Sequence, residues 1–472
     1  MVSVSLYTLG CKVNQLESES IADAFRVRGF RVLPWNGAAG EPMVDILVIN
    51  TCTVTSKAEQ KARRIIRKAL RDHPQAVLMV TGCYAQLAGE ALQSLGREDG
   101  SVPVEANRLM VVSGDTKSLL LDLPGFLADT MPEQIAPVLL SQWLRDQETP
   151  LVKKAERFRF SPGDFSLHSR ASVKIQDGCD NHCSYCRVRL ARGRSVSLEA
   201  ERVRAAVQAL EAKGYTEAVI TGVNITQYRD TSAPQEGALH LAALLRDLLS
   251  GTERIRLRLS SLEPEGLTDD LIAVLGHPRI RPHFHLSVQS GSPAILEQMG
   301  RRYTPETIET GVRRLRAVKD DPFLACDIIT GFPGETAEEF EKTYALCRGI
   351  GFAWIHAFPY SPRPGTEAYT YPGAVSEREA VLRVDRLITL GREGRHAYSR
   401  RWLGREVEAV LEAHGEPHPS EAVGVADNYL KLLVRFPDHE PPLTGKPCRC
   451  RIYGFPEEHG AFSRFDALAE CL

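Results

Sequence analysis

The sequence predicts an α/β protein with three parts: an N-terminal parallel α/β domain, a partial (βα)6 barrel and a small C-terminal β-barrel. Short apolar strands alternate with helical patterns near the start, and the same alternation is sustained over six strands in the middle of the chain. After about residue 400 the pattern changes to short strands joined by glycine- and proline-containing connections, which is typical of a small β-barrel. A chain of 472 residues also exceeds what one core usually organises.

The composition is that of an ordinary soluble enzyme, with 43% hydrophobic and 25% charged residues. No apolar run is long enough to cross a bilayer, so we expect a cytoplasmic protein with no membrane partner. The net charge of −2 argues against non-specific coating of nucleic acid, and any RNA contact must therefore be local. The eleven cysteines, an odd number, favour metal-binding or catalytic thiolates over a disulfide framework.

Three cysteines of the first part each follow a predicted strand. The strands cover residues 3–8, 45–50 and 76–80, and they precede Cys11, Cys52 and Cys83. The carboxyl ends of parallel strands meet at one edge of a sheet, where such folds bind ligands. We therefore expect these thiols to meet in space. The alternative is three buried core thiols.

The next segments are less uniform. A helix is expected to begin near Gln15, and another to cover 56–72, where Ser56 and Glu59 form a capping-box pattern. From about residue 100 to 170 the periodicity weakens around a helix expected near 137–146. This region predicts a linker or insertion.

Six apolar strands predict the barrel, and its chemistry is expected at their carboxyl ends. They cover residues 171–175, 217–221, 255–259, 283–288, 324–329 and 354–358, with helices at 199–212, 304–318 and 337–349 among the connections. In the last part, strands are expected at 406–412, 429–434 and around 448–452. Five further cysteines have no ligand-like spacing and are interpreted as core or incidental thiols: Cys326, Cys347, Cys448, Cys450 and Cys471.

The strongest local motif lies in the loop after the first barrel strand, where Cys179, Cys183 and Cys186 stand at short, fixed spacings. Three thiolates on one loop can hold three irons of a cubane cluster and leave the fourth iron without a protein ligand. A structural zinc site, with His182 as the fourth ligand, is the alternative. Such sites normally have a shorter first spacing, and no second cysteine pair lies nearby.

This spacing, at the top of a partial barrel, resembles the radical S-adenosylmethionine (SAM) superfamily. The resemblance implies that the open iron chelates the amino and carboxylate groups of SAM, and that electron transfer releases a 5′-deoxyadenosyl radical. The other strand-end loops then become the expected SAM pocket. Gly222 lets the backbone approach closely, Asn224 can bond the amino group, and Glu263 can accept from it or from a ribose hydroxyl. The further candidates are Ser261, Gln289, Ser290 and Asp327.

Each of these pocket residues also has an ordinary interpretation, since glycine is common in turns and a single Gln or Glu is usually solvated.

The combination with Cys11, Cys52 and Cys83 resembles the methylthiotransferases of this superfamily. The resemblance implies a second cluster with an open iron, so that the cofactors are two [4Fe-4S] clusters and SAM. It also implies an external electron donor, a sulfur source and a terminal TRAM barrel associated with RNA binding. The expected limits are 1–125 for the first domain, 126–165 for the linker, 166–400 for the radical SAM barrel and 401–472 for the TRAM-like barrel.

Three substrates are known in that family: isopentenyladenosine in tRNA, threonylcarbamoyladenosine in tRNA and an aspartate of a ribosomal protein. The segments 9–15 (LGCKVNQ) and 50–55 (NTCTVT) and the basic helix 61–71 resemble the threonylcarbamoyladenosine branch, which implies methylthiolation of the adenosine at position 37, beside the anticodon.

One stripe of the basic helix is expected to grip phosphates of the anticodon stem-loop: Lys61, Arg64, Lys68 and Arg71. The alternative is a plain solvated helix face.

Two points remain open at this stage. After Cys186 the family tends to have an apolar residue and a proline, whereas this chain has Arg-Val-Arg-Leu-Ala-Arg, whose arginines are candidates for phosphate contacts. A non-catalytic iron-sulfur or zinc protein that binds RNA as a scaffold is the alternative of another class. The polar residues at several barrel strand ends argue against it.

Overall fold

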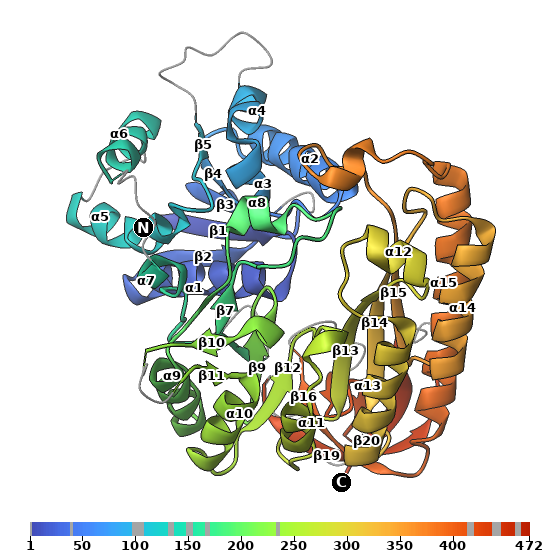
Figure 1. Ribbon diagram of the computed structural model, residues 1–472. Coiled ribbons are helices and arrows are strands. Elements are labelled where there is room, and N and C mark those ends of the chain that lie inside the picture. The colour runs from blue at the N-terminus through green and yellow to red at the C-terminus, as the bar shows by residue number, and fades with distance from the viewer. Residues whose placement is uncertain are drawn as a thin grey trace.

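The protein is described by a computed structural model (Figure 1). The structure describes residues 2–37, 41–96, 108–130, 136–147, 154–165, 170–232, 237–412, 420–436, 445–457 and 464–472. Parts of the predicted linker, at 131–135 and 148–153, lie outside the described residues, and so does most of the stretch from 97 to 107. Among the helices described, none is long and apolar enough to cross a membrane.

The N-terminal part contains a parallel five-stranded sheet with the order β2-β1-β3-β4-β5. Every residue of β3 and β4 is buried, which agrees with their central place and their unbroken apolar runs. The two edge strands were not predicted, because they are short and one is half exposed. The strands are β1 (Ser3–Thr8), β2 (Arg31–Pro34), β3 (Ile46–Thr51), β4 (Val77–Gly82) and β5 (Leu109–Val111).

Helices pack on both faces of this sheet (Figure 1). One face is covered by α2 (Ser56–Asp72), α3 (Cys83–Leu87) and α4 (Gly89–Gln93). The other is covered by α1 (Lys12–Val27), the 3-10 turn η3 (Lys117–Leu121), α5 (Leu123–Thr130) and α6 (Pro137–Gln147). The segment predicted as a linker thus contributes a helix to the N-terminal core, before the short α7 (Lys154–Arg157).

Two helix starts differ from the sequence-based expectation. Helix α1 begins at Lys12, directly after Cys11, instead of near Gln15. The cap of α2 is Thr55, whose side chain accepts the Ala58 N–H, so the predicted capping box on Ser56 is wrong by one residue. Glu59 pairs instead with Arg187 and Arg363 of the large barrel.

The barrel has the six predicted strands, all joined by parallel pairing. They form two three-stranded sheets, which two isolated parallel bridges connect between the third and fourth strands. In order they are β6 (Ala171–Lys174), β9 (Glu217–Thr221), β12 (Arg256–Leu259), β13 (His283–Gln289), β14 (Phe323–Thr330) and β15 (Trp354–Pro359). The predicted fold class is therefore confirmed for this part.

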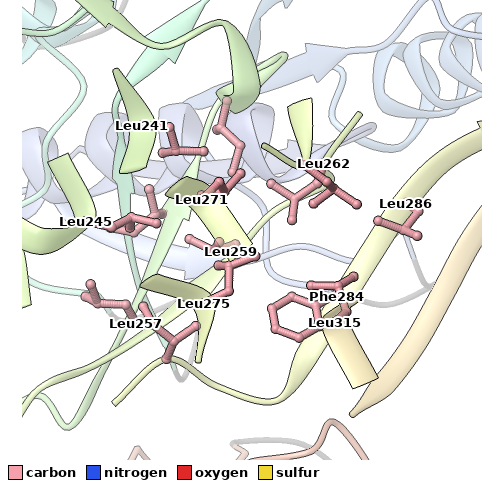
Figure 2. Packing of buried hydrophobic residues seen from close by; sticks show 14 of the residues in the cluster. Leu241, Leu245, Leu257, Leu259, Leu262, Leu271, Leu275, Phe284, Leu286 and Leu315 are labelled. Carbon is pink, nitrogen blue, oxygen red and sulfur yellow. The ribbon is translucent and has the colours of Figure 1, made fainter. Parts of the chain in front are cut away.

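Helices cover the outside of the barrel, and leucine-rich packing joins them to the strands, as Figure 2 shows for Leu257 and Leu259 beside Leu245 and Leu275. The covering helices are α9 (Ala200–Ala212), α10 (Leu241–Ser250), α11 (Asp269–Leu275), α13 (Pro305–Val318), α14 (Ala337–Ile350) and α15 (Glu377–Arg400). Shorter elements are α8 (Val188–Arg192), α12 (Pro293–Gln298), β7 (Gln176–Asp177), β8 (Val196–Ser197), β10 (Arg229–Asp230) and β11 (Leu239–His240).

The C-terminal part is a closed β-barrel, as predicted. Its strand order is β16-β17-β18-β20-β19, and two of these strands, β17 and β20, were not predicted. It packs against the amino ends of the large barrel's strands. There Tyr429 stacks on His283, with ring centroids 4.0 Å apart, and Arg281 donates to Glu408 at 2.7 Å. Its strands are β16 (Glu406–Leu411), β17 (Glu421–Ala426), β18 (Lys431–Arg435), β19 (Pro447–Gly454) and β20 (Ala467–Cys471).

Candidate active site

Three cysteines lie at the carboxyl ends of three neighbouring strands. Cys11 precedes α1, Cys52 follows β3, and Cys83 is the first residue of α3. Glycines before two of them allow the loops to approach. A Cβ on Gly10, at φ +113°, would lie 2.9 Å from the Cys52 Cβ, and one on Gly82, at φ +98°, would collide with the backbone of the neighbouring loop.

The three thiols share one site, which we call the strand-end trio. Burial raises the pKa of Cys11, and the neighbouring Cys83 raises it further. Burial likewise raises the pKa of Cys52 to about 12, with Cys11 and Cys83 acting in the same direction. All three are free cysteines. A metal would therefore displace protons from Cys11 and Cys52, whose thiols burial keeps protonated.

The second group, which we call the loop trio, is Cys179, Cys183 and Cys186 on the turn between β7 and α8. The Cys179 sulfur accepts the Asn181 N–H at 3.4 Å, and the Cys186 sulfur accepts the Val188 N–H at the same distance. The pKa of Cys186 is raised to about 12, chiefly by burial, and the other two thiols act in the same direction. The loop trio is therefore also one cluster of thiols.

Neither trio is arranged to hold a single metal ion. Within the described part of the chain, no three His, Cys, Asp or Glu side chains converge closely enough for such a site. His182, the candidate fourth zinc ligand, is exposed and lies 2.6 Å from Arg189 through its Nδ1. The zinc alternative therefore finds no ligand set among the described residues.

The arginines that follow the loop trio reach across to the N-terminal part. Arg187 pairs with Glu59 of α2 at 3.2 Å, and Arg192 donates through Nε–H to the Cys83 sulfur at 3.2 Å. From a third loop, Arg363 also pairs with Glu59. The expectation that these loop arginines contact phosphate is therefore wrong for Arg187 and Arg192, which are used inside the protein.

Gln176, which the sequence analysis did not single out, organises the loop trio's surroundings. It is fully buried, and its Nε2 donates to the Gly178 carbonyl at 2.7 Å while its Oε1 accepts the Asn224 N–H at 2.9 Å. A Cβ on Gly222 would lie 2.9 Å from the Gln176 carbonyl oxygen. Position 222 therefore requires glycine because Gln176 of β7 approaches it closely.

The predicted pocket residues near the third and fifth strands are joined through groups that the sequence did not reveal. Ser261 Oγ lies 2.8 Å from His285 Nδ1, and the His285 Nε2 lies 3.2 Å from Asp327. Glu263 accepts from Arg301 at 2.6 Å. Burial raises the pKa of Glu263, and Arg301 opposes that shift.

Arg301 also donates to the Tyr185 hydroxyl, which places this ion pair beside the loop trio.

The two residues at the end of β13 differ from each other. Gln289 is a non-glycine residue at φ +65°, an unusual conformation that tends to occur at functional sites. Ser290 is fully buried, and its hydroxyl lies 3.1 Å from that of Thr343 on α14. The Ser290 side chain therefore ties the loop to a helix.

The basic stripe of α2 lies on the surface of the N-terminal part. Lys61, Arg64 and Arg71 are exposed, and Lys68 is half-buried and paired with Asp72 at 2.5 Å. These four residues line one side of an open groove of ≈ 770 Å³, whose other wall includes Tyr7. The stripe thus presents positive charge at a concave surface.

Two known families match the chain. The Radical SAM superfamily matches residues 173–347, and the Uncharacterized protein family UPF0004 matches residues 3–102. The threonylcarbamoyladenosine tRNA methylthiotransferase MtaB of Treponema pallidum (strain Nichols) is 42% identical, over 96% of this chain and 98% of its own. The chain belongs to the radical SAM tRNA methylthiotransferases.

Two further relatives of this methylthiotransferase bear different names. The MtaB protein of Bacillus subtilis (strain 168) is 32% identical over 98% of this chain and 97% of its own. The tRNA-2-methylthio-N(6)-dimethylallyladenosine synthase of Jannaschia sp. (strain CCS1) is also 32% identical, over 91% of this chain and 88% of its own. The relative with the highest identity among these three is an MtaB protein.

Radical SAM methylthiotransferases of this type use two [4Fe-4S] clusters and SAM. The residues of this methylthiotransferase fit these groups. Each trio offers three free thiols. Beside the loop trio, the amide nitrogen of Asn224 is buried without a hydrogen-bond acceptor. The Asn224 side chain also lies close to Cys179, where it opposes the effect of burial, which raises the pKa of this thiol. A buried donor of this kind suits a polar ligand at the loop trio.

Proposed function

We propose that this enzyme methylthiolates threonylcarbamoyladenosine at position 37 of tRNA, giving the 2-methylthio derivative. The observation that carries the proposal is the pairing of two cysteine trios, each at strand ends, across an interface that Arg192 spans. The substrate rests on the relative in Treponema pallidum, which is 42% identical over nearly the whole of both chains.

In this proposal, the loop trio binds the cluster that engages SAM, and the strand-end trio binds the auxiliary cluster. Each set contributes three thiolates, which leaves one metal position for a ligand that is not protein. When bound, the clusters and SAM supply the one-electron chemistry, the sulfur and the methyl group that replace a C–H bond by a methylthio group. The chain itself contributes binding, orientation and exclusion of water.

The SAM pocket is proposed to use buried polar groups around the loop trio. We propose that Glu263, which Arg301 holds in position at 2.6 Å, accepts from the amino group of SAM. Asn224, predicted to bond the same group, has its amide nitrogen free and is proposed to donate to the SAM carboxylate instead. The Ser261, His285 and Asp327 side chains form a connected polar row that runs from the loop after β12 across β13 and β14, which suits hydroxyl groups of a nucleoside.

Gly222, Gln289 and Ser290 shape the same pocket mainly through their backbone.

The basic groove on α2 is proposed to bind phosphates of the anticodon stem-loop. Helix α2 starts in the loop that carries Cys52, and the groove lies along the helix beyond its first turn. Phosphate contacts from lysine and arginine fix the register of an RNA without reading its sequence. The terminal barrel packs at the opposite end of the large barrel's strands, so its contact with RNA would be a second, separate one.

Further parts of the proposal are a cytoplasmic location, an external electron donor and a source of sulfur. The proposed domain limits are 1–125, 126–165, 166–400 and 401–472, and the second segment packs against the first through α6.

The deciding experiment is an analysis of tRNA nucleosides from a strain that lacks the gene. Loss of 2-methylthio-threonylcarbamoyladenosine, restored by the wild-type gene but not by Cys183→Ala, is the expected result. Loss of the isopentenyl nucleoside, or of a modified ribosomal-protein aspartate, would move the substrate to another branch. If no methylthio group is lost anywhere, the scaffold interpretation takes the place of the enzyme.

A further inference from the structure

Beside the strand-end trio, five charged side chains are buried together. They come from both the N-terminal part and the large barrel, and none is more than about a tenth exposed. We call them the buried charge network, and its members are Glu17, Lys117, Lys174, Asp177 and Arg192. Buried charges of this kind are costly unless they are paired, so a network of this size needs a reason.

Arg192 is the centre of the network. Its Nη1 donates to Glu17 and to Asp177, each at 3.1 Å, and its Nη2 donates to the Asn14 side chain at 2.8 Å. The remaining donor, Nε–H, points at the Cys83 sulfur at 3.2 Å. A guanidinium held on all sides in this way has a fixed orientation. The sulfur contact is therefore built into the fold.

The charges of the network do not balance. Lys117, Lys174 and Arg192 are positive, and among the described residues the carboxylates that pair with them are those of Glu17 and Asp177, so this paired set has one formal positive charge in excess. The carboxylates stay ionised. Although burial opposes it, the neighbouring cations lower the pKa of Glu17 to about 2, and Asp177 lies 2.5 Å from the Lys174 ammonium and 3.1 Å from Arg192. The excess charge therefore faces Cys83, which is anionic once it binds metal.

We propose that Arg192 is a positioning residue for the auxiliary cluster: it orients Cys83 as a ligand and supplies the positive charge that sets the cluster's reduction potential. This inference rests on the proposed cluster ligands. Hydrogen bonds to cysteine sulfurs and the net charge nearby are two of the factors that tune such potentials. A nearby positive charge favours the reduced, more negative cluster, so it raises the potential.

The position of Arg192 adds a second consequence. It is the last residue of α8, the helix that follows the loop trio, so the chain that carries one cluster site directly supports a ligand of the other. One side chain thus connects the two cluster sites.

The test uses the full-length protein with the loop trio removed (Cys179→Ala, Cys183→Ala and Cys186→Ala), so that only the auxiliary cluster remains. Its midpoint potential is measured by a redox titration followed by electron paramagnetic resonance, without SAM or tRNA. In this background, Arg192→Met is expected to shift the potential to a more negative value. The control Arg194→Met removes an exposed arginine two residues away, paired with Asp180, and should leave the potential unchanged.

Asp177→Asn gives the opposite sign. It removes a carboxylate and increases the excess positive charge, so the potential should become more positive. The double variant Arg192→Met/Asp177→Asn restores the original excess but lacks the hydrogen bond to sulfur, and its potential should lie between those of Arg192→Met and the parent. A residue with only a structural role would not produce shifts of opposite sign.

Two outcomes contradict the inference. If Arg192→Met binds the same iron with the same potential as Arg194→Met, Arg192 does not tune the cluster. If Arg192→Met and Asp177→Asn shift the potential in the same direction, charge is not the cause. A parent that binds no iron would instead contradict the ligand assignment of the strand-end trio, and with it the proposed function.

Discussion

The two cysteine trios are built in opposite ways. The loop trio stands on one short turn after β7, so its spacing along the chain already brings its sulfurs together. The strand-end trio is distributed over three loops, which the pairing of β1, β3 and β4 brings together. The first site therefore depends on local sequence, whereas the second depends on the register of a sheet. Changes to ligands and changes to backbone should affect the two sites differently.

Removal of a loop-trio ligand should have the largest effect. Cys183→Ala should abolish 5′-deoxyadenosine formation from SAM, because an incomplete ligand set cannot position the sulfonium. The thiol is only half-buried, so we expect the protein to stay folded, with an unchanged circular dichroism spectrum. A normal yield of 5′-deoxyadenosine in the purified variant would contradict the role of the loop trio.

Removal of a strand-end ligand should separate two steps. Cys52→Ala should still produce 5′-deoxyadenosine, since the loop trio is complete. It should form no methylthio nucleoside on a tRNA substrate that carries threonylcarbamoyladenosine at position 37. Both products are measured in one assay by mass spectrometry, with Cys347→Ala, a buried thiol of the barrel core, as the control. Methylthiolated product from Cys52→Ala would remove the auxiliary cluster from the proposal.

A backbone change at the end of β4 should damage the strand-end trio and not the loop trio. Gly82→Ala places a Cβ against the Thr51 backbone at φ +98°, and we expect it to destabilise the protein by about 2 kcal/mol or more and to lower the iron bound by the strand-end trio.

Gly214→Ala is the matched control, because Gly214 has φ +84° but no atom within 4 Å of the added Cβ. It should cost only about 1–2 kcal/mol and leave the iron content unchanged. Equal iron loss in both variants would mean that the clash at the strand ends is irrelevant. Urea unfolding and iron analysis measure the two effects.

The smallest expected effect concerns RNA. Lys61→Ala with Arg64→Ala should weaken tRNA binding several-fold and lower the salt slope of the affinity by about 2, one for each phosphate contact. SAM cleavage without RNA should be unaffected. Arg313→Ala with Arg392→Ala removes the same charge from two exposed positions on the outside of the large barrel, α13 and α15, and should not alter the salt slope. Equal salt slopes for the two double variants would mean that Lys61 and Arg64 do not contact tRNA phosphates.

Much of the fold follows from local patterns. The buried runs of β3 and β4 stand out because central parallel strands are apolar throughout. The large-barrel strands are more mixed, as β12 (RLRL) and β13 (HFHLSVQ) show, and they stand out because short strands alternate regularly with helices. The short or half-exposed strands β2, β5, β17 and β20 were missed, because they become strands only through pairing with a neighbour. The cap of α2 was displaced by one residue, because Glu59 is held by Arg187 and Arg363 from the large barrel.

The sequence by itself determined the two sets of thiols, the succession of most strands along the chain and the edge of each sheet where chemistry is expected. Spacing and strand periodicity are properties of a local segment, so they can be read from it. Only the tertiary structure decided that Arg192 bonds Cys83, that Gln176 makes Gly222 necessary, and that Arg301 holds Glu263. Those contacts join segments that are distant in the chain, and a polar side chain has no local signal of the partner that folding will bring to it.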